Sequence, residues 1–152
     1  MIIRVPGMTK PGTRCDHPVS LIDIYPTLID LCGLQGNTIK GEKGKKLDGF
    51  SMKPFLKDPV KGKWDGPDVA LTTIRSTKSK WGQENDLHHS VRYKRYRYIR
   101  YNNGKEELYD HENDAYEWNN LIGNSEYRTV RDEHFKKMKK ILGPDSFIPE
   151  NK

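Results

Sequence analysis

The second half of the chain alternates runs rich in β-branched and aromatic residues with short turn-forming segments. Residues 89–93 and 96–101 are two such runs, and Asn102-Asn103-Gly104 follows the second. Asparagine and glycine tolerate the positive φ angles of a tight hairpin, so this tripeptide predicts that the chain reverses direction. Two further runs occupy residues 69–75 and 107–109. We therefore expect a small antiparallel sheet of about four strands.

A helix is predicted near the C-terminus, over residues 126–142. Its apolar positions recur at spacings of three and four, which places them on one helical face. These positions are Tyr127, Val130, His134, Met138 and Ile141. Gly143-Pro144 would end the helix, because proline cannot continue it. Packing this helix on one face of the sheet gives an α+β fold.

The first half mixes one apolar block with glycine-rich connections. Residues 1–5 predict a short strand, and residues 19–34 predict a helix that Ser20 and Asp23 begin with a capping box. Pro26 indicates a kink or a true helix start close to it. Residues 36–63 are rich in glycine and lysine, which is typical of a connection. One short helical turn is expected there, after Ser51.

The composition is lean in apolar residues for a domain of 152 residues. Hydrophobic residues make up 34% and charged residues 32%, and the mean hydropathy is -0.91. Counted with glycine and without tyrosine, the apolar share is about 37%, against a usual ~45–50%. No apolar run approaches the ~18 residues of a membrane span. We expect a folded piece that packs against something else.

The charge pattern leaves two interpretations open. Between Ser90 and Tyr101 the chain has five basic residues and no acidic one, in a protein of net charge +6. On a half-covered sheet such residues form an ordinary solvated face. Alternatively, interleaved tyrosines and cations suit a basic module that binds polyanions, either RNA or a sulfated glycan. The chain has no RNP-type motif, which disfavours nucleic acid as a partner.

Few residues have the spacing of a reactive centre. Cys15 and Cys32 cannot build a disulfide framework and lack zinc-site spacing. Neighbouring residues of a strand point to opposite faces, so His88 and His89 cannot both ligate one ion. No nucleophile elbow, phosphate-binding loop or metalloprotease motif is present. The chain alone is therefore not expected to be a complete enzyme.

Four segments, taken in order, resemble formylglycine-dependent sulfatases of the alkaline-phosphatase-like superfamily. Residues 19–34 are similar to the helix after the catalytic sheet, and residues 47–56 to a "DG-x-S-x-x-P-x-L" element. Residues 90–110 resemble a C-terminal hairpin and its "ELYD" strand, and residues 114–121 a "DP-x-E-x-x-NL" turn with Ala115 in place of proline. The details are closest to iduronate-2-sulfatase-like and choline-sulfatase-like members.

The resemblance implies the C-terminal portion of a sulfuric ester hydrolase. That family's nucleophile arises from Cys/Ser-x-Pro-x-Arg, and neither Cys15 nor Cys32 stands in such a motif. No catalytic or metal-ligating residue is therefore expected in this chain. Formylglycine and calcium are implied for the intact enzyme only. Family members are periplasmic, secreted or lysosomal, and the chain itself begins with no signal peptide.

The same resemblance implies an organisation and a partner. Residues 1–35 would be a strand and helix left over from the catalytic α/β core, residues 36–67 a connection, and residues 68–152 the C-terminal subdomain. The expected partner is a sulfated substrate, bound once the chain is joined to a catalytic portion. That portion would be the missing part of one enzyme or a separate chain. No membrane partner is expected.

Substrate contacts are predicted at the loop before the second strand. His89 and His88 lie at its end, and Lys78, Lys80 and Trp81 lie within it. Cations suit sulfate and uronate groups, and an indole ring suits the apolar face of a sugar. In the intact enzyme the C-terminal subdomain would close one side of the active-site cleft and help to select the sulfated substrate.

Overall fold

The computed structural model describes residues 1–34, 44–76 and 86–143. The chain divides into two compact units, Met1–Asp68 and Val69–Lys152. In the described part of the chain, no helix is both long enough and apolar enough to cross a membrane.

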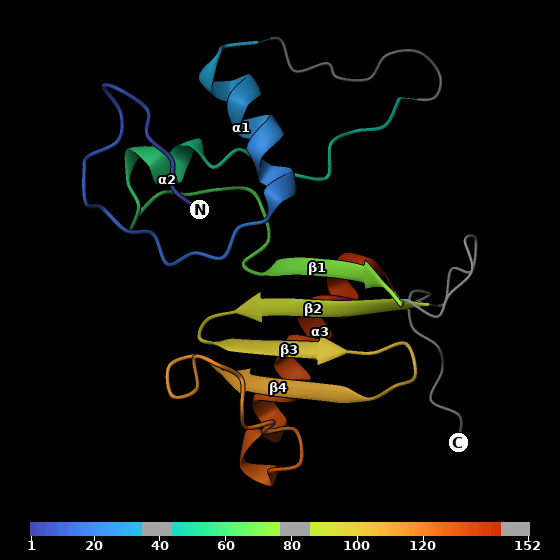
Figure 1. The fold of residues 1–152 in the computed structure, drawn as a ribbon. Coiled ribbons are helices and arrows are strands. Elements are labelled where there is room, and N and C mark those ends of the chain that lie inside the picture. The colour runs from blue at the N-terminus through green and yellow to red at the C-terminus, as the bar shows by residue number, and fades with distance from the viewer. Residues whose placement is uncertain (35–43, 77–85, 144–152) are drawn as a thin grey trace. The chain divides into compact units, whose positions relative to one another are not determined.

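The second unit contains the predicted four-stranded antiparallel sheet (Figure 1). Its strands are β1 (Ala70–Arg75), β2 (Leu87–Tyr93), β3 (Tyr96–Arg100) and β4 (Glu106–Asp110), paired in the order of the sequence. The turn between β3 and β4 forms as expected, since Gly104 has φ 80° and its N–H donates to the carbonyl of Tyr101 at 3.1 Å. Each strand thus pairs with the next one along the chain.

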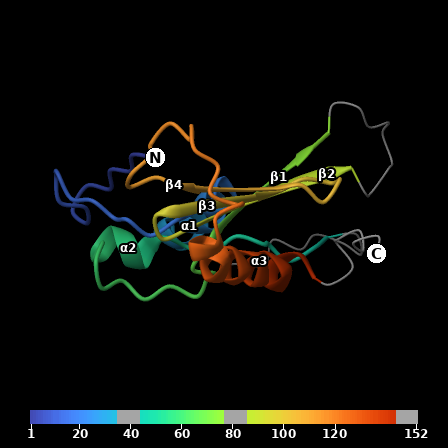
Figure 2. The same ribbon diagram turned by 90° about the horizontal axis from the view of Figure 1, so that it is seen from below.

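One helix covers one face of this sheet (Figure 2). A 3₁₀ turn, Ser125–Tyr127, leads into α3 (Arg128–Leu142), which ends at Gly143 with φ 85°. The buried apolar core lies between α3 and the sheet and consists of Val69, Val91, Tyr98, Leu108 and Met138. Because strand side chains alternate between faces, the opposite face carries Ser90, Arg92 and Arg97. The predicted α+β arrangement of sheet and helix is confirmed.

The first unit contains the helix predicted from the apolar block. A 3₁₀ turn, Leu21–Asp23, continues into α1 (Ile24–Leu31), so the helix begins close to Pro26. The buried Asp23 carboxylate accepts the N–H of Ser20 at 2.7 Å, as a capping box requires. It also accepts the N–H of Phe50 at 2.9 Å, which ties α1 to a distant segment.

Further hydrogen bonds to α1 explain the residue pattern of the "DG-x-S-x-x-P-x-L" element. The N–H of Met52 donates to Thr27 Oγ1 at 2.8 Å, and Lys53 Nζ donates to Asp30 Oδ1 at 2.7 Å. Helix α2 (Lys53–Lys57) then begins with Pro54 in its first turn, where the missing N–H would have had no partner within the helix. Gly49 lies so close to the 3₁₀ turn before α1 that an added Cβ would stand 2.1 Å from the carbonyl oxygen of Ile22. The element therefore holds its segment against α1 and the turn before it, through hydrogen bonds to three side chains and one close backbone approach.

The predicted strand at residues 1–5 is wrong. Ile2 is 99% exposed, and the carbonyl of Val5 instead accepts the N–H groups of Met8 and Thr9 in a tight turn. A strand needs a neighbour to pair its backbone groups, and none of the described residues supplies one. β-Branched residues alone do not make a strand.

Helix α1 and the 3₁₀ turn before it leave much of their apolar surface uncovered within the first unit. Leu21, Ile22, Tyr25 and Leu28 are between 51% and 79% exposed. Beside them runs an open groove of about 260 Å³, lined by the first three residues, by α1 and by Met52. The expectation that this helix packs against something outside the chain gains support from this surface.

Candidate functional site on the open face of the sheet

The face of the sheet opposite α3 carries a connected polar network. Arg97 Nη1 donates to both carboxylate oxygens of Glu117, at 2.8 and 2.9 Å, and Arg97 Nε donates to Ser90 Oγ at 3.0 Å. His111 Nε2 lies 2.5 Å from Glu117 Oε1, and Arg92 Nη1 contacts His111 Nδ1. An arginine can only donate, so Nδ1 accepts and the proton of the ring lies on Nε2. Arg97 and His111 thus contact the Glu117 carboxylate directly. Ser90 contacts Arg97, and Arg92 contacts His111.

Within this network, burial and hydrogen bonding shift the pKa of Glu117 in opposite directions. Burial acts to raise the pKa of Glu117, but the hydrogen bonds from His111 and Arg97 outweigh it and hold the pKa below its usual range. Burial also lowers the pKa of the Arg92 guanidinium. We therefore infer that Glu117 is ionised at neutral pH and that it neutralises only part of the positive charge on this face.

Glu117 reaches the network from a rigid turn after β4. Asp114 Oδ2 accepts the N–H of Asn119 at 2.8 Å, and Asn120 Oδ1 accepts the N–H of Leu108 at 3.0 Å. Glu117 itself has φ 59°, which is uncommon outside glycine and asparagine. These are the residues of the "DP-x-E-x-x-NL" turn, so the motif describes how a carboxylate is positioned. Sequence reasoning assigned no role to Glu117, although the motif contains it.

His88 and His89 point to opposite faces, as alternation predicts. His88 lies on the open face, where its Nδ1 accepts the N–H of Asn102 at 3.2 Å and its ring packs edge-on to Tyr101. His89 lies on the face that α3 covers, is only 5% exposed, and has its Nδ1 2.9 Å from Thr73 Oγ1. Burial and then the nearby charge of His88 lower the pKa of His89. The structure does not bring the two imidazoles to one site.

The other predicted contacts, Lys78, Lys80 and Trp81, lie outside the described residues. The loop that contains them is closed at its base, because the N–H of Ser76 donates to the carbonyl of Asp86 at 2.8 Å. The Asp86 side chain also accepts from Asn102 Nδ2 at 2.9 Å, next to His88. The base of this loop therefore adjoins His88 on the open face.

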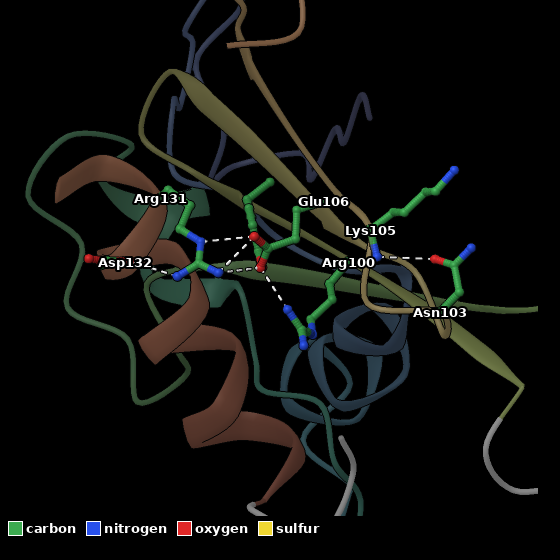
Figure 3. A network of polar contacts seen from close by, with 7 residues as sticks. Arg100, Asn103, Lys105, Glu106, Arg131 and Asp132 are labelled. Carbon is green, nitrogen blue, oxygen red and sulfur yellow. Dashed lines mark hydrogen bonds and ion pairs between the residues drawn. The ribbon is translucent and has the colours of Figure 1, made fainter. Parts of the chain in front are cut away.

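On the α3 side, a second network holds the helix to the sheet (Figure 3). Glu106 accepts from Arg100 Nη1 at 2.7 Å and from Arg131 Nη2 at 2.7 Å, and the Tyr98 hydroxyl also donates to it. Burial acts to raise the pKa of Glu106, but these hydrogen bonds hold it below the usual range. Burial raises the pKa of the Tyr98 hydroxyl well above its ordinary value. This network is structural, since α3 and the sheet enclose it.

All five basic residues between Ser90 and Tyr101 have partners. Arg95 pairs with Asp110 at 3.1 Å and with Glu112, and Lys94 lies 3.9 Å from Glu133. Arg92, Arg97 and Arg100 belong to the networks described above. Four of the five pair with carboxylates, and ion-paired cations attract a polyanion less strongly than free ones, which weakens the interpretation of this strand pair as a polyanion-binding module.

The described residues do not fit a metal centre or a formylglycine nucleophile. Among them no group of three or more histidine, cysteine, aspartate or glutamate side chains could hold a metal ion. Cys15 and Cys32 are both exposed free thiols, and neither stands in a Cys/Ser-x-Pro-x-Arg motif. We therefore derive no catalytic step through either group in this chain.

Comparison with known proteins gives one consistent set of matches. The family described as "N-sulphoglucosamine sulphohydrolase, C-terminal" matches residues 1–143. A curated protein of Formosa agariphila named "Sulfatase" is 33% identical over 124 residues, which are 82% of this chain and 20% of that protein.

Two solved structures share the fold. One, described as a 2-O GAG sulfatase, has a TM-score of 0.68 at 28% identity and covers 90% of this chain and 28% of its own. Another, solved in complex with its substrate D-glucosamine-2-N,6-O-disulfate, has a TM-score of 0.70 at 23% identity and covers 93% and 27%. The chain thus spans a fifth of the curated relative and about a quarter of each solved structure.

Proposed function

The chain belongs to the N-sulphoglucosamine sulphohydrolase C-terminal family, and from this premise we propose that it completes an enzyme that hydrolyses sulfate esters of a carbohydrate. It is the C-terminal portion of a sulfatase. The observation that carries the proposal is the extent of the match: the family covers residues 1–143, whereas the chain spans only 20% of the curated sulfatase. The finer assignment to iduronate-2-sulfatase-like or choline-sulfatase-like members stays a prediction.

The exposed face of α1 is proposed to dock on the catalytic portion of the enzyme. Leu21, Ile22, Tyr25 and Leu28 are each more than half exposed, and a monomeric protein rarely leaves a large apolar patch in water. Complete burial of each such side chain is worth roughly 1.5–3 kcal/mol. The open groove beside α1 would receive apolar side chains of the same partner. Docking would thus explain the low apolar content of the chain.

The open face of the sheet is proposed to form one wall of the substrate cleft. His88 is the best placed of the predicted contacts, because its Nδ1 already accepts a hydrogen bond from Asn102 and its Nε2 is then the donor. A sulfate or carboxylate group would accept from Nε2. Arg92, half-buried on the same face, adds positive charge. His89, on the covered face of the sheet, would hold β2 to β1 behind this wall through its contact with Thr73.

Hydrolysis itself is assigned to the remainder of the enzyme. Formylglycine and calcium are proposed to lie there, so this chain would bind and orient the substrate and would release no sulfate by itself. The remainder is either part of the same polypeptide or a separate catalytic chain. Co-purification of a second sulfatase chain with this one would distinguish the two.

A chimera tests the proposal. The fifth of the Formosa agariphila sulfatase that matches this chain is replaced by the chain, and sulfate release is measured with calcium present. We expect the chimera to release sulfate, and His88→Ala in the chimera to raise the KM more than it lowers the kcat. A chimera that folds and stays soluble but releases no sulfate would contradict the proposed function.

A further inference from the structure

We propose that Tyr116 and Trp118 form a platform that binds a sugar ring of the carbohydrate chain, away from its sulfate ester. The two side chains are 77% and 80% exposed, and their rings stack with centroids 5.3 Å apart and an interplanar angle of 21°. The outer face of each ring is therefore open to solvent. This inference rests on the proposed function and names a second contact with the same class of substrate.

The pair is held in place before any ligand arrives. Glu117 lies between the two aromatic residues in the sequence, and its carboxylate is fixed by Arg97 and His111. The turn that contains them is further fixed by the side chain of Asp114, which accepts the N–H of Asn119. A preorganised surface loses less conformational entropy on binding than a mobile one. Exposed aromatic rings on a fixed turn are therefore suited to a weakly bound ligand.

The surroundings of the pair fit a sugar better than a protein. Asn119, the residue after Trp118, is exposed, and its side-chain amide can donate to and accept from hydroxyl groups. In the described part of the second unit, the other large apolar residues that are exposed, Ile74 and Ile141, lie outside this turn. A stable protein interface needs about 800 Å² from each partner, far more than two rings supply. A pyranose has one apolar face and a rim of hydroxyls, which matches this arrangement.

The test separates ring stacking from charge. Two fluorescently labelled heparin tetrasaccharides, one native and one chemically desulfated, are titrated with the full chain and followed by anisotropy. We expect the desulfated sugar to bind weakly and without strong salt dependence. Trp118→Ala should weaken its binding about tenfold, which corresponds to the upper range for one aromatic contact. Trp118→Phe should retain most of the affinity, and Ile141→Ala, which removes an exposed apolar side chain of α3, should change nothing.

Three outcomes would overturn the platform. The first is no binding of the desulfated sugar, and the second is binding that Trp118→Ala leaves unchanged. The third is a chimera that no longer folds to a soluble protein when Trp118 is replaced while the sugar affinity of the chain stays the same, which would make the pair a protein contact. Sulfate release by the unsubstituted chimera does not depend on any of these results, so failure of the platform and failure of the proposed function are read separately.

Discussion

Glu117 joins the two cationic strands of the open face to the turn after β4. Its carboxylate binds Arg97 and His111, and its own backbone adopts a positive φ of 59°. Such a conformation costs free energy and persists only where the surroundings fix it. The ion pair supplies that restraint, since the side chain of Glu117 is 22% exposed and both of its oxygens are engaged.

Glu117→Gln should lower the free energy of unfolding by about 1–3 kcal/mol at neutral pH, because Arg97 and His111 lose a charged acceptor. The pKa of Glu117 determines how this contribution to the free energy of unfolding changes with pH. The folded-state pKa lies below the ordinary value of 4.5, so the stabilisation is complete above pH 4.5 and is lost as the pH falls through the folded-state value. Urea unfolding at several pH values measures both effects.

The matched control for that substitution is Glu112→Gln. Glu112 pairs with Arg95 at the surface and its side chain is 62% exposed, so its loss should cost no more than about 0.5 kcal/mol. Equal losses for the two variants, or an acid-induced loss of stability that Glu117→Gln leaves unaltered, would show that Glu117 has no special role.

Contacts between individual side chains were harder to predict from the sequence than the helices and strands. His88 and His89 could be assigned to opposite faces, since alternation in a strand requires it. The pattern also indicates which of them α3 covers, because His89 alternates in step with the apolar Val91 and Tyr93. The Arg97–Glu117 pair joins residues 20 apart, and only the turn motif offered a signal for it. Lys78, Lys80 and Trp81 stay predictions.

Elements follow from local patterns where a partner lies within the chain. The four strands, α3 and the turn at Gly104 agree with the sequence to within a few residues, because each packs on or pairs with its neighbour. Residues 1–5 have the composition of a strand but find no pairing partner among the described residues. The same reason explains the uncovered face of α1. Sequence patterns predict local structure, but pairing depends on what the element meets.

The attachment of α3 to the sheet should depend on Glu106. Its side chain is 14% exposed and holds Arg100, which is 6% exposed, so Glu106→Gln leaves a buried guanidinium without its carboxylate. We expect a loss of about 3 kcal/mol in the free energy of unfolding. Arg131→Met should cost only about 1 kcal/mol, because Arg131 is more exposed and Glu106 keeps its other partners. Urea denaturation would contradict this order if Arg131→Met were the more damaging change.

The face of α1 should matter to the assembled enzyme and not to the fold of the chain. Leu21→Gln with Tyr25→Gln places two amides on surface that is already 79% and 56% exposed. The isolated chain should keep its thermal unfolding midpoint within a few degrees, since surface substitutions change stability by about 0.5 kcal/mol or less. The chimera with the same two substitutions should lose most of its sulfate release. Full activity of that chimera would show that α1 does not dock.

At the scale of the whole molecule, the net charge says less about polyanion binding than the ion pairs that the charged side chains form. The net charge of +6 allows polyanion binding, but the arginines of β2, β3 and the turn between them have carboxylate or histidine partners. Arg95→Ala with Arg97→Ala should therefore leave retention on heparin and oligonucleotide columns nearly unchanged. A marked loss of retention, together with a steep salt dependence, would favour a polyanion-binding module instead.

The order of segments identified the family at this scale, where single motifs would have been weak. The division of labour between this chain and the rest of the enzyme has a simple test, which is the sulfate released from a fluorogenic aryl sulfate by the purified chain with calcium added. We expect no release above a blank without protein, while the chimera with the Formosa agariphila sulfatase turns over the same ester. Reproducible turnover by the chain alone would contradict the assignment of the chemistry to another part of the enzyme.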